Sequence, residues 1–206
     1  MLKEKIKQEP RNAFLHIFLG YNYSKQGMPD IGKKYYDMAL TSLDVNPSYG
    51  GIMGRIFKDY SLLDYAIAAY KKAMEANDRS NFDFQIAQIY GEKGDFKKMF
   101  EAYIDLVDKN GTYLNLVQRY ASRYITEDPQ DPNNILFKKT LLRKSINNSK
   151  NEWNILLSWL FTQQKEYQKA FIQEKALYQR QFNDLLEILE LGKIAFEDGD
   201  YSAAKD

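Results

Sequence analysis

The nine residues LGYNYSKQG, Leu19–Gly27, contain a pattern that returns five more times along this chain of 206 residues. Its second residue is Gly20, and a small residue recurs about every 34 residues, at Gly54, Ala87, Ala121, Ser158 and Gly192. A bulky apolar residue precedes each small one, at Leu19, Met53, Ile86, Tyr120, Leu157 and Leu191. An aromatic residue follows, at Tyr23, Phe57, Tyr90, Tyr124 and Phe161, with Ala195 as the exception. This self-match predicts an array of helical repeats.

A turn residue divides each repeat into two helices. It stands at Gly27, Ser61, Gly94, Asp128 and Gly199, with Lys165 as the exception. Glycine there is free to adopt a positive φ and end one helix before the next begins. A second small column follows at Gly32, Ala66, Ala170 and Ala204, replaced by Met99 in the third repeat. Facing small residues let two helices approach closely, so each repeat is predicted to be an antiparallel pair that stacks on its neighbours.

The chain resembles the tetratricopeptide repeat (TPR) family over nearly its whole length. The resemblance is strongest in Leu19–Gly27, Asp64–Glu75, Ile89–Lys98 and Leu191–Lys205. The tryptophan that this family often places before the bulky column is replaced, in the first repeat by His16, and only Pro10 remains of its closing prolines. The resemblance implies an all-α solenoid of antiparallel helix pairs, wound into a right-handed superhelix with a concave groove that binds proteins or peptides.

The spacing predicts a single array over residues 1–206. Its repeats are 13–46, 47–79, 80–113, 114–150, 151–184 and 185–206, and residues 1–12 are the end of a preceding repeat or an N-terminal helix. The last repeat is incomplete, which indicates a piece of a longer protein or an array capped by its neighbours. Leu191, Ile194 and Tyr201 should then lack cover, and we expect self-association through the array ends or fraying there.

The fourth repeat is irregular because EDPQDPNN, Glu127–Asn134, replaces the short turn. Its two prolines disfavour helix in the residues that precede them, and Asn133 or Asn134 is suited to cap the next helix. We interpret the stretch as a structural loop. The alternative is a calcium loop, but the regular ligand spacing and the closing glutamate are absent; its ligands would be Glu127, Asp128 and Asp131.

Composition narrows the functional classes. A formal net charge of +1 argues against nucleic acid as the main partner. No apolar run is long enough to insert into a membrane, and no targeting segment is evident, so a soluble protein is expected, in the cytoplasm or a periplasm-like compartment. The chain has no cysteine and a single histidine, His16, which leaves neither thiol chemistry nor a multi-histidine metal site. We therefore predict no enzyme activity and no cofactor.

Two other clusters have alternative interpretations. Gly50 and Gly51 provide either local flexibility or room for the backbone of a ligand. A basic cluster lies on the second helix of the fourth repeat, where it is either a solvated face or a site for an acidic partner; its members are Lys138, Lys139, Arg143 and Lys144.

The candidate binding residues lie on a second stripe of each first helix, which faces away from the paired helix. In the TPR family this stripe lines the groove. The candidates for peptide binding are Ile17, Tyr21, Arg55, Lys58, Phe84, Gln88, Ile155, Trp159, Lys193 and Phe196. Trp159 is expected to remain partly accessible, whereas Trp153 should pack against a neighbour. Ile17 and Tyr21 replace the lysine and asparagine of carboxylate-clamp domains, so that subclass is not supported.

A protein-interaction scaffold that binds a peptide or a partner protein is the expected function. The alternative is a purely architectural segment of a larger multidomain protein. A binding module should keep groove side chains accessible, whereas a spacer should fill the groove.

Overall fold

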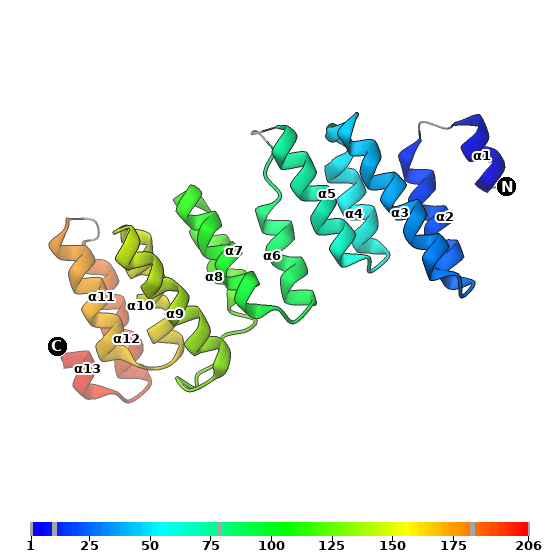
Figure 1. Ribbon diagram of the computed structural model, residues 1–206. Coiled ribbons are helices and arrows are strands. Elements are labelled where there is room, and N and C mark those ends of the chain that lie inside the picture. Colours follow the sequence, from blue (N-terminus) through cyan, green and yellow to red (C-terminus); the bar gives the residue numbers. More distant parts are fainter. Residues whose placement is uncertain (1, 10–11, 78–79, 182–183, 206) are drawn as a thin grey trace. The chain divides into compact units, whose positions relative to one another are not determined.

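The computed structural model describes residues 2–9, 12–77, 80–181 and 184–205. These residues are almost entirely helical, and none of them lies in a strand (Figure 1). The chain separates into two compact units, Met1–Gly94 (unit 1) and Asp95–Asp206 (unit 2). Pro10, expected to close a repeat, and residues 79 and 206, expected repeat boundaries, lie outside the described ranges.

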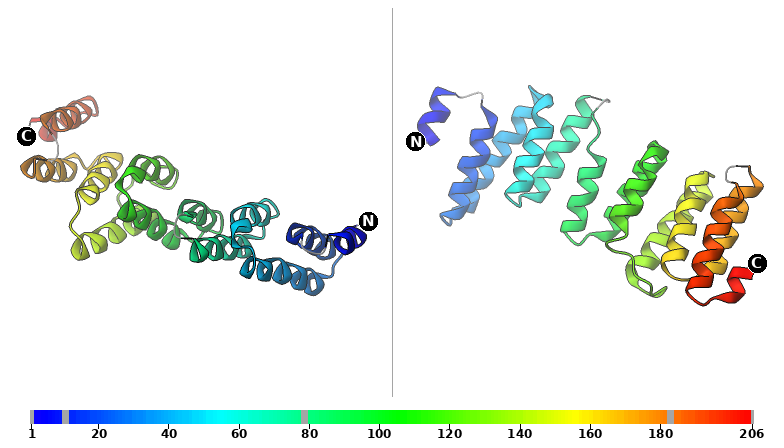
Figure 2. Two further views of the ribbon diagram at one scale, coloured as in Figure 1. Left: turned by 90° about the horizontal axis from the view of Figure 1, so that it is seen from above. Right: turned by 180° about the vertical axis from the view of Figure 1, so that it is seen from behind.

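Unit 1 consists of six α-helices and two 3₁₀ turns. They are α1 (Leu2–Gln8), α2 (Ala13–Lys25), α3 (Pro29–Thr41), η1 (Ser42–Asp44), η2 (Pro47–Tyr49), α4 (Gly50–Asp59), α5 (Leu63–Ala76) and α6 (Asp83–Glu92). The helices α2 and α3 form one antiparallel pair, and α4 and α5 form the next (Figures 1 and 2). The sequential pairing predicted from the two small columns is therefore confirmed in this unit.

Unit 2 contains two close helix pairs and one longer connection, across which the helices of the predicted fourth repeat do not pack closely on each other. Its elements are α7 (Phe96–Lys109), η3 (Gly111–Tyr113), α8 (Leu114–Ala121), α9 (Pro132–Asn147), α10 (Asn151–Gln163), α11 (Tyr167–Gln179), α12 (Leu185–Glu197) and α13 (Tyr201–Lys205). Helices α10 and α11 pair closely, as do α12 and α13. None of the helices in the described ranges has both the length and the apolarity needed to cross a lipid bilayer.

The turns fall where the repeat pattern predicts them. Gly27, Gly94 and Gly199 have positive φ angles of 79°, 73° and 84°. Ser61 and Lys165, which occupy the same column, have φ angles of 58° and 55° although neither is glycine. A left-handed conformation is unfavourable for a residue with a Cβ atom. At Ser61 and Lys165 the packing therefore imposes this backbone conformation without glycine, whereas Asp128, in the irregular fourth repeat, does not adopt it.

The side chain of Lys165 connects three of these turns. Its Nζ atom lies 3.4 Å from the Glu127 carboxylate and 3.5 Å from that of Asp198. The Tyr167 hydroxyl also donates a hydrogen bond to Asp198. Glu127, Lys165 and Asp198 belong to the connections after α8, α10 and α12. Lys165, which stands in place of a usual turn residue, thus provides a positive charge that glycine would lack.

We expect Ser61→Gly to stabilise unit 1 by about 0.5–1 kcal/mol. The substitution removes a left-handed conformation that costs an ordinary residue about 1–2 kcal/mol, while glycine loses somewhat more entropy on folding. Chemical denaturation followed by circular dichroism measures the change. Ser61→Ala is the matched control, since alanine keeps the strained φ; equal effects of the two substitutions would contradict the argument.

Tyrosine rings cover the small column of the first helices in unit 1. A Cβ atom built on Gly20 would lie 2.6 Å from the Tyr36 ring, and one built on Gly54 would lie 2.5 Å from the Tyr70 ring. Both tyrosines are only 4% exposed. In α2 and α4, the glycine therefore leaves room for an aromatic ring from the paired helix. This close approach is the physical reason for the small column.

The long connection in unit 2 is organised by a buried asparagine. Asn134 is 0% exposed. Its Nδ2 atom donates to the backbone oxygens of Thr126 and Asp128, and its Oδ1 atom accepts from the Thr126 backbone N–H. Asp131, rather than the expected Asn133 or Asn134, caps α9 by accepting from the backbone N–H of Asn133. The cap prediction was wrong because Pro132 occupies the first helical position, which places the cap at Asp131, two residues before Asn133.

Candidate functional site

A cavity of about 460 Å³ opens in unit 1 where α4, α5 and α6 meet. It is lined by Ser48, Gly51, Ile52, Arg55, Lys58, Asp59, Tyr70, Phe82, Gln85 and Gln88. Ile52, Tyr70 and Phe82 form an apolar floor, and the charged and amide side chains surround it. Such a combination of apolar area with a few polar groups is typical of ligand pockets in proteins.

Phe82 shapes this cavity. Its ring stacks on Tyr70, with 4.9 Å between ring centroids and 24° between ring planes. A Cβ atom on Gly51 would lie 2.7 Å from the tip of the Phe82 ring. The absence of a side chain at Gly51 therefore makes room for Phe82 and not for the backbone of a ligand. Gly50 has a similar role, since its Cβ atom would lie 2.6 Å from that of Ala73 on α5.

An adjoining cavity of about 300 Å³ shares Ser48, Gly51 and Phe82 with the first. Its other lining residues come from the end of α5 and the two connections beside it, and they are Pro47, Ala73, Ala76, Asn77 and Ser80. Phe82 is held between the two cavities because its backbone N–H donates to the Met74 sulfur at 3.2 Å. Together the two cavities form one hollow, which we call the α4–α6 groove.

The two cationic side chains of the α4–α6 groove, Lys58 and Arg55, differ in whether they form an ion pair. Lys58 forms an ion pair with Glu92 at 2.8 Å between Nζ and Oε1. Arg55 is exposed, and no ion pair joins it to another residue in the described part of the chain. Burial raises the pKa of Tyr70, while the Arg55 charge acts in the opposite direction and Asp59 reinforces the rise. Arg55 is thus a cation beside an apolar floor, with its guanidinium available to a ligand.

Two amide side chains also line the larger cavity of the α4–α6 groove. Gln85 and Gln88 are both half-buried on α6 and three residues apart, so they face the cavity from the same side of the helix. Each amide can donate and accept hydrogen bonds, as backbone groups of an extended peptide require. The sequence stripe included Gln88 but missed Gln85, which the i, i+3 spacing could have indicated. It also missed Phe82, since that residue precedes its helix and has no place in the stripe.

The other candidates in unit 1 lie elsewhere. Ile17 is 0% exposed and belongs to the hydrophobic core. Tyr21 is half-buried and packs on Tyr60, with 4.4 Å between ring centroids. Phe84 is half-buried on α6 and does not line the α4–α6 groove. Of the unit 1 candidates, the structure therefore brings Arg55, Lys58 and Gln88 together in one cavity.

The unit 2 candidates divide between two helices. Ile155 and Trp159 are half-buried on α10, and the Trp159 ring contacts Phe137 edge-on at 6.0 Å between centroids. Trp153 on the same helix is only 1% exposed. The burial predicted for Trp153 and the partial exposure predicted for Trp159 are confirmed, while access to Trp159 from a groove stays a prediction. Lys193 and Phe196 lie on α12 beside a separate apolar cavity of about 520 Å³.

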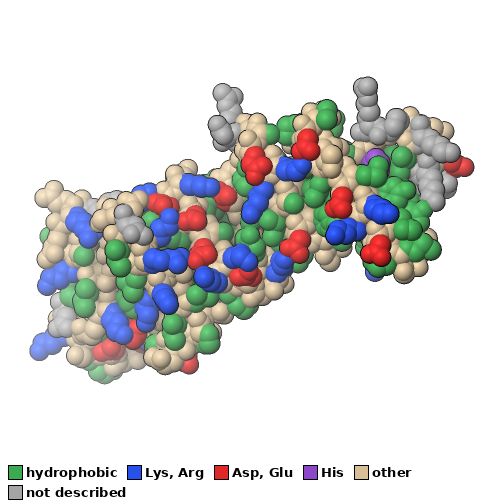
Figure 3. Space-filling view, in the orientation of Figure 1, with side chains coloured by type: hydrophobic (Ala, Val, Ile, Leu, Met, Phe, Trp, Pro, Cys, Tyr) green, Lys and Arg blue, Asp and Glu red, His purple; other side chains and the backbone are tan. Residues whose placement is uncertain are grey.

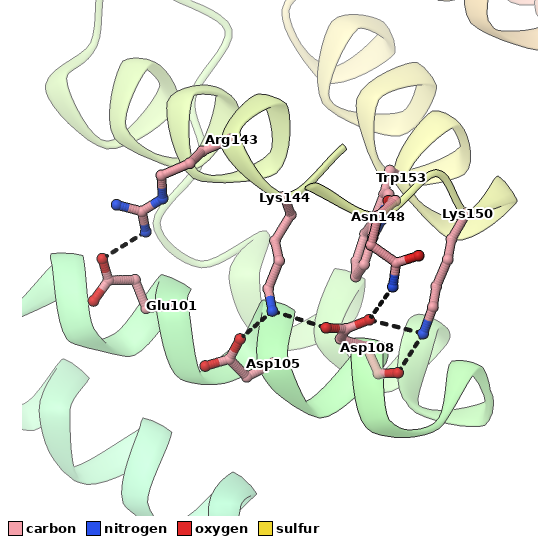
Figure 4. Close-up of polar contacts among 8 residues, drawn as sticks. All are labelled: Glu101, Asp105, Asp108, Arg143, Lys144, Asn148, Lys150 and Trp153. Atoms are coloured by element: carbon pink, nitrogen blue, oxygen red, sulfur yellow. Dashed lines mark hydrogen bonds and ion pairs between the residues drawn. The ribbon is translucent and has the colours of Figure 1, made fainter. Parts of the chain in front are cut away.

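The basic cluster on α9 finds acidic partners within unit 2. Arg143 pairs with Glu101 at 2.8 Å, and Lys144 pairs with both Asp105 and Asp108 at 2.8 Å. Figure 4 shows that these carboxylates all project from α7 toward α9. Figure 3 likewise shows Lys and Arg side chains interspersed with Asp and Glu on the displayed face. Carboxylates of this chain therefore already pair with two of the four basic residues that were considered as a site for an acidic partner.

Asp108 is the centre of this network. Besides Lys144, it pairs with Lys150 at 2.7 Å and accepts a hydrogen bond from the Asn148 amide at 3.1 Å (Figure 4). The hydrogen bonds from Lys144 and Lys150 lower the pKa of Asp108 to about 2 from an ordinary value of 3.8. The adjacent Trp153 Nε1 atom donates to the backbone oxygen of Asn148 at 2.8 Å. This network thus connects α7 to the start of α10.

We expect unit 2 to lose stability as the pH falls from about 4 to about 2. The pKa of Asp108 is lower in the folded state, so its ionised form stabilises the fold above its ordinary pKa of 3.8 and protonation removes that contribution. Asp108→Asn should cost about 1–3 kcal/mol at pH 7 and flatten this dependence. Urea denaturation across this pH range measures both effects. Asp105→Asn is the control, and an unchanged pH dependence in Asp108→Asn would refute the assignment.

Within the described residues, no group of three or more histidine or acidic side chains is arranged to hold a metal ion. No model of a protein family matches the chain. No curated protein shows significant similarity to it either. The functional argument therefore rests on the geometry of the helix pairs and of the α4–α6 groove.

Proposed function

We propose that this chain is a TPR-like α-solenoid that serves as a protein-interaction scaffold. Positive φ angles at Ser61 and Lys165 support the repeat, because both residues occupy the turn column without being glycine. The Gly20–Tyr36 and Gly54–Tyr70 contacts support it also, since two successive pairs repeat one packing arrangement. A right-handed superhelix and a concave face are part of the proposal and follow from the resemblance to the TPR family.

The α4–α6 groove is the proposed binding site, and its ligand is a peptide segment of a partner protein. The observation that carries the proposal is the convergence of Arg55, Gln85 and Gln88 around an apolar floor. The floor suits an apolar anchor side chain of the peptide, while the amides suit its backbone. We propose that this groove binds its ligand and does not catalyse a reaction on it.

Selection of peptides from a phage-displayed library on the purified chain tests this proposal. Peptides that are enriched should bind the unaltered protein and lose at least tenfold in affinity on Arg55→Glu, because the substitution reverses the unpaired charge at the groove. Lys71→Glu is the matched control, since Lys71 is an exposed residue of α5 outside the groove. Failure to enrich any peptide, or equal losses in the two variants, would refute the groove assignment.

The alternative of a purely architectural segment is favoured by one observation in the first helix pair. There the stripe is filled, with Ile17 in the core and Tyr21 packed on Tyr60. A spacer is expected to have this property throughout, whereas the α4–α6 groove remains open. The same selection separates the two functions, since a spacer would enrich no groove-dependent peptide.

A further inference from the structure

Two helices of unit 2, α9 and α12, expose several apolar side chains, but they differ in the charges beside them. On α12, Leu191 is only 7% exposed, contrary to expectation, because α11 and α13 both pack on this helix. Tyr201 of α13 is 65% exposed, as expected. The charges on α12 next to these residues, Glu190 and Lys193, are of both signs. On α9 every charged side chain is a cation, so this helix specifies the charge of whatever binds it.

The outward side of α9 has a narrow apolar stripe, which we call the α9 stripe. Its members are Ile135, Leu142 and Ile146, which are 41%, 45% and 84% exposed. At about 100° per residue, the three side chains fall within about 40° of the helix circumference. Phe137 and Leu141, on the far side of the helix, are both 0% exposed. Apolar residues on both sides are typical of a helix that is covered on both.

Cations accompany the α9 stripe. Lys139 lies in line with it, while Lys138 and Arg143 lie on its two flanks. Arg143 pairs with Glu101 of α7, whereas no ion pair joins Lys138 or Lys139 to another residue in the described part of the chain. None of the 16 residues of α9 is acidic. Two positive charges beside the stripe are therefore left without a partner from this chain.

The spacing along α9 is that of a coiled-coil seam. From Ile135, the intervals to Lys139, Leu142 and Ile146 are four, three and four residues. These alternating intervals bring one side chain per turn to face a second helix, and a charged residue within the seam selects the partner and its register. The seam extends over about 16 Å, or roughly three turns, which is the length of a short amphipathic helix.

We propose that the α9 stripe binds an amphipathic α-helix of a partner protein, and that aspartate or glutamate residues of this helix pair with Lys138 and Lys139. The apolar side chains of the partner helix cover Ile135, Leu142 and Ile146. A second copy of α9 does not fit, because it would bring like charges together. A membrane surface fits less well, because the stripe is narrow and contains no aromatic side chain. This surface is separate from the α4–α6 groove and does not depend on the function proposed for that groove.

Selection from a library of helices tests the proposal. The outward positions of one helix in a small helical scaffold are randomised, and the full chain is the bait. We expect the enriched helices to have apolar residues at intervals of three and four, with aspartate or glutamate beside them. Biolayer interferometry then measures the affinity of each enriched helix for the chain and its variants, and circular dichroism checks that the variants retain their helices.

Reversing both lysine charges, by Lys138→Glu with Lys139→Glu, should weaken binding at least tenfold, because two attractions become repulsions. The matched control is Lys33→Glu with Lys34→Glu, which reverses another adjacent pair of exposed lysines, on α3. An enriched helix whose acidic residues are replaced by lysine should in turn bind the Lys138→Glu, Lys139→Glu variant more tightly than the unaltered chain. This exchange of charge identifies a direct pairing.

Ile146→Ser should also weaken binding at least tenfold, whereas Ile172→Ser, at an exposed isoleucine of α11, should leave it unchanged. Enrichment of no acidic helix, or equal losses in the stripe variants and their controls, would overturn the proposal. Light scattering that shows a dimer dispersed by Ile146→Ser would overturn it and assign the stripe to a second copy. Sedimentation of the chain with phosphatidylserine vesicles, abolished by Ile146→Ser, would likewise overturn it and assign the stripe to a membrane surface.

Discussion

Trp153→Ala is expected to lower the free energy of unfolding of unit 2 by about 3–5 kcal/mol, the range found when a buried aromatic side chain is truncated to alanine. Trp153 is 1% exposed, and its Nε1 atom donates a hydrogen bond to the Asn148 backbone oxygen. The substitution therefore creates a large cavity and also removes a hydrogen bond that holds the start of α10. Chemical denaturation followed by tryptophan fluorescence measures the loss, because the remaining tryptophan, Trp159, lies on the same helix.

Trp159→Ala is the matched control. Trp159 is partly exposed, so its truncation removes fewer packed contacts and should cost about 1–2 kcal/mol. In that variant Trp153 provides the fluorescence signal. Equal losses in the two variants would show that the burial of the two rings does not determine their contribution to stability.

Gly20→Ala is expected to destabilise unit 1 by about 1–3 kcal/mol, although alanine has the higher helix propensity. Its Cβ atom would lie 2.6 Å from the Tyr36 ring and 2.8 Å from the Gly32 backbone oxygen. The ring can rotate away, but the backbone oxygen can move only if α2 and α3 separate. Thermal unfolding measures the loss, and hydrogen exchange should locate it in these two helices.

Gly192→Ala is the control from the same column. Its Cβ atom meets nothing closer than 3.9 Å, so the gain in helix propensity should dominate and stabilise α12 by up to about 1 kcal/mol. Glycine-to-alanine substitution is thus expected to lower stability at position 20 and to raise it at position 192, although the two positions are equivalent in the repeat. A loss of stability in Gly192→Ala would show that the space over this residue is smaller than the structure indicates.

Much of the local structure was predictable from the repeat. The turns at Gly27, Ser61, Gly94 and Lys165 follow from column positions, and the structure confirms each of them. The exception was the cap of α9, where Asp131 replaced the expected asparagines. Caps depend on the exact residue at which a helix begins, and periodicity locates that point only to within one or two residues.

The candidate site was predictable only in part. The stripe correctly placed Arg55, Lys58 and Gln88 on a common surface, but it gave no means of ranking them above Ile17 or Tyr21. Phe82 had no signal at all, because it lies in a connection and reaches the groove through a gap left by Gly51. Similarly, Arg143 and Lys144 were visible as a basic cluster, while their pairing with carboxylates of α7 was not.

By itself, the sequence determined most of the helices and turns and the pairing of α2 with α3, α4 with α5, α10 with α11 and α12 with α13, because these depend on spacings within one repeat of about 34 residues. It did not determine the packing of α9, which lies on α7 and α10 rather than on α8. Only the tertiary structure decided which side chains remain accessible. Ile17 and Leu189 occupy equivalent positions in their helices, yet one is 0% exposed and the other 59%. Their difference arises from what packs against each helix. Burial is a property of two surfaces, and the residues of one surface alone do not specify the other.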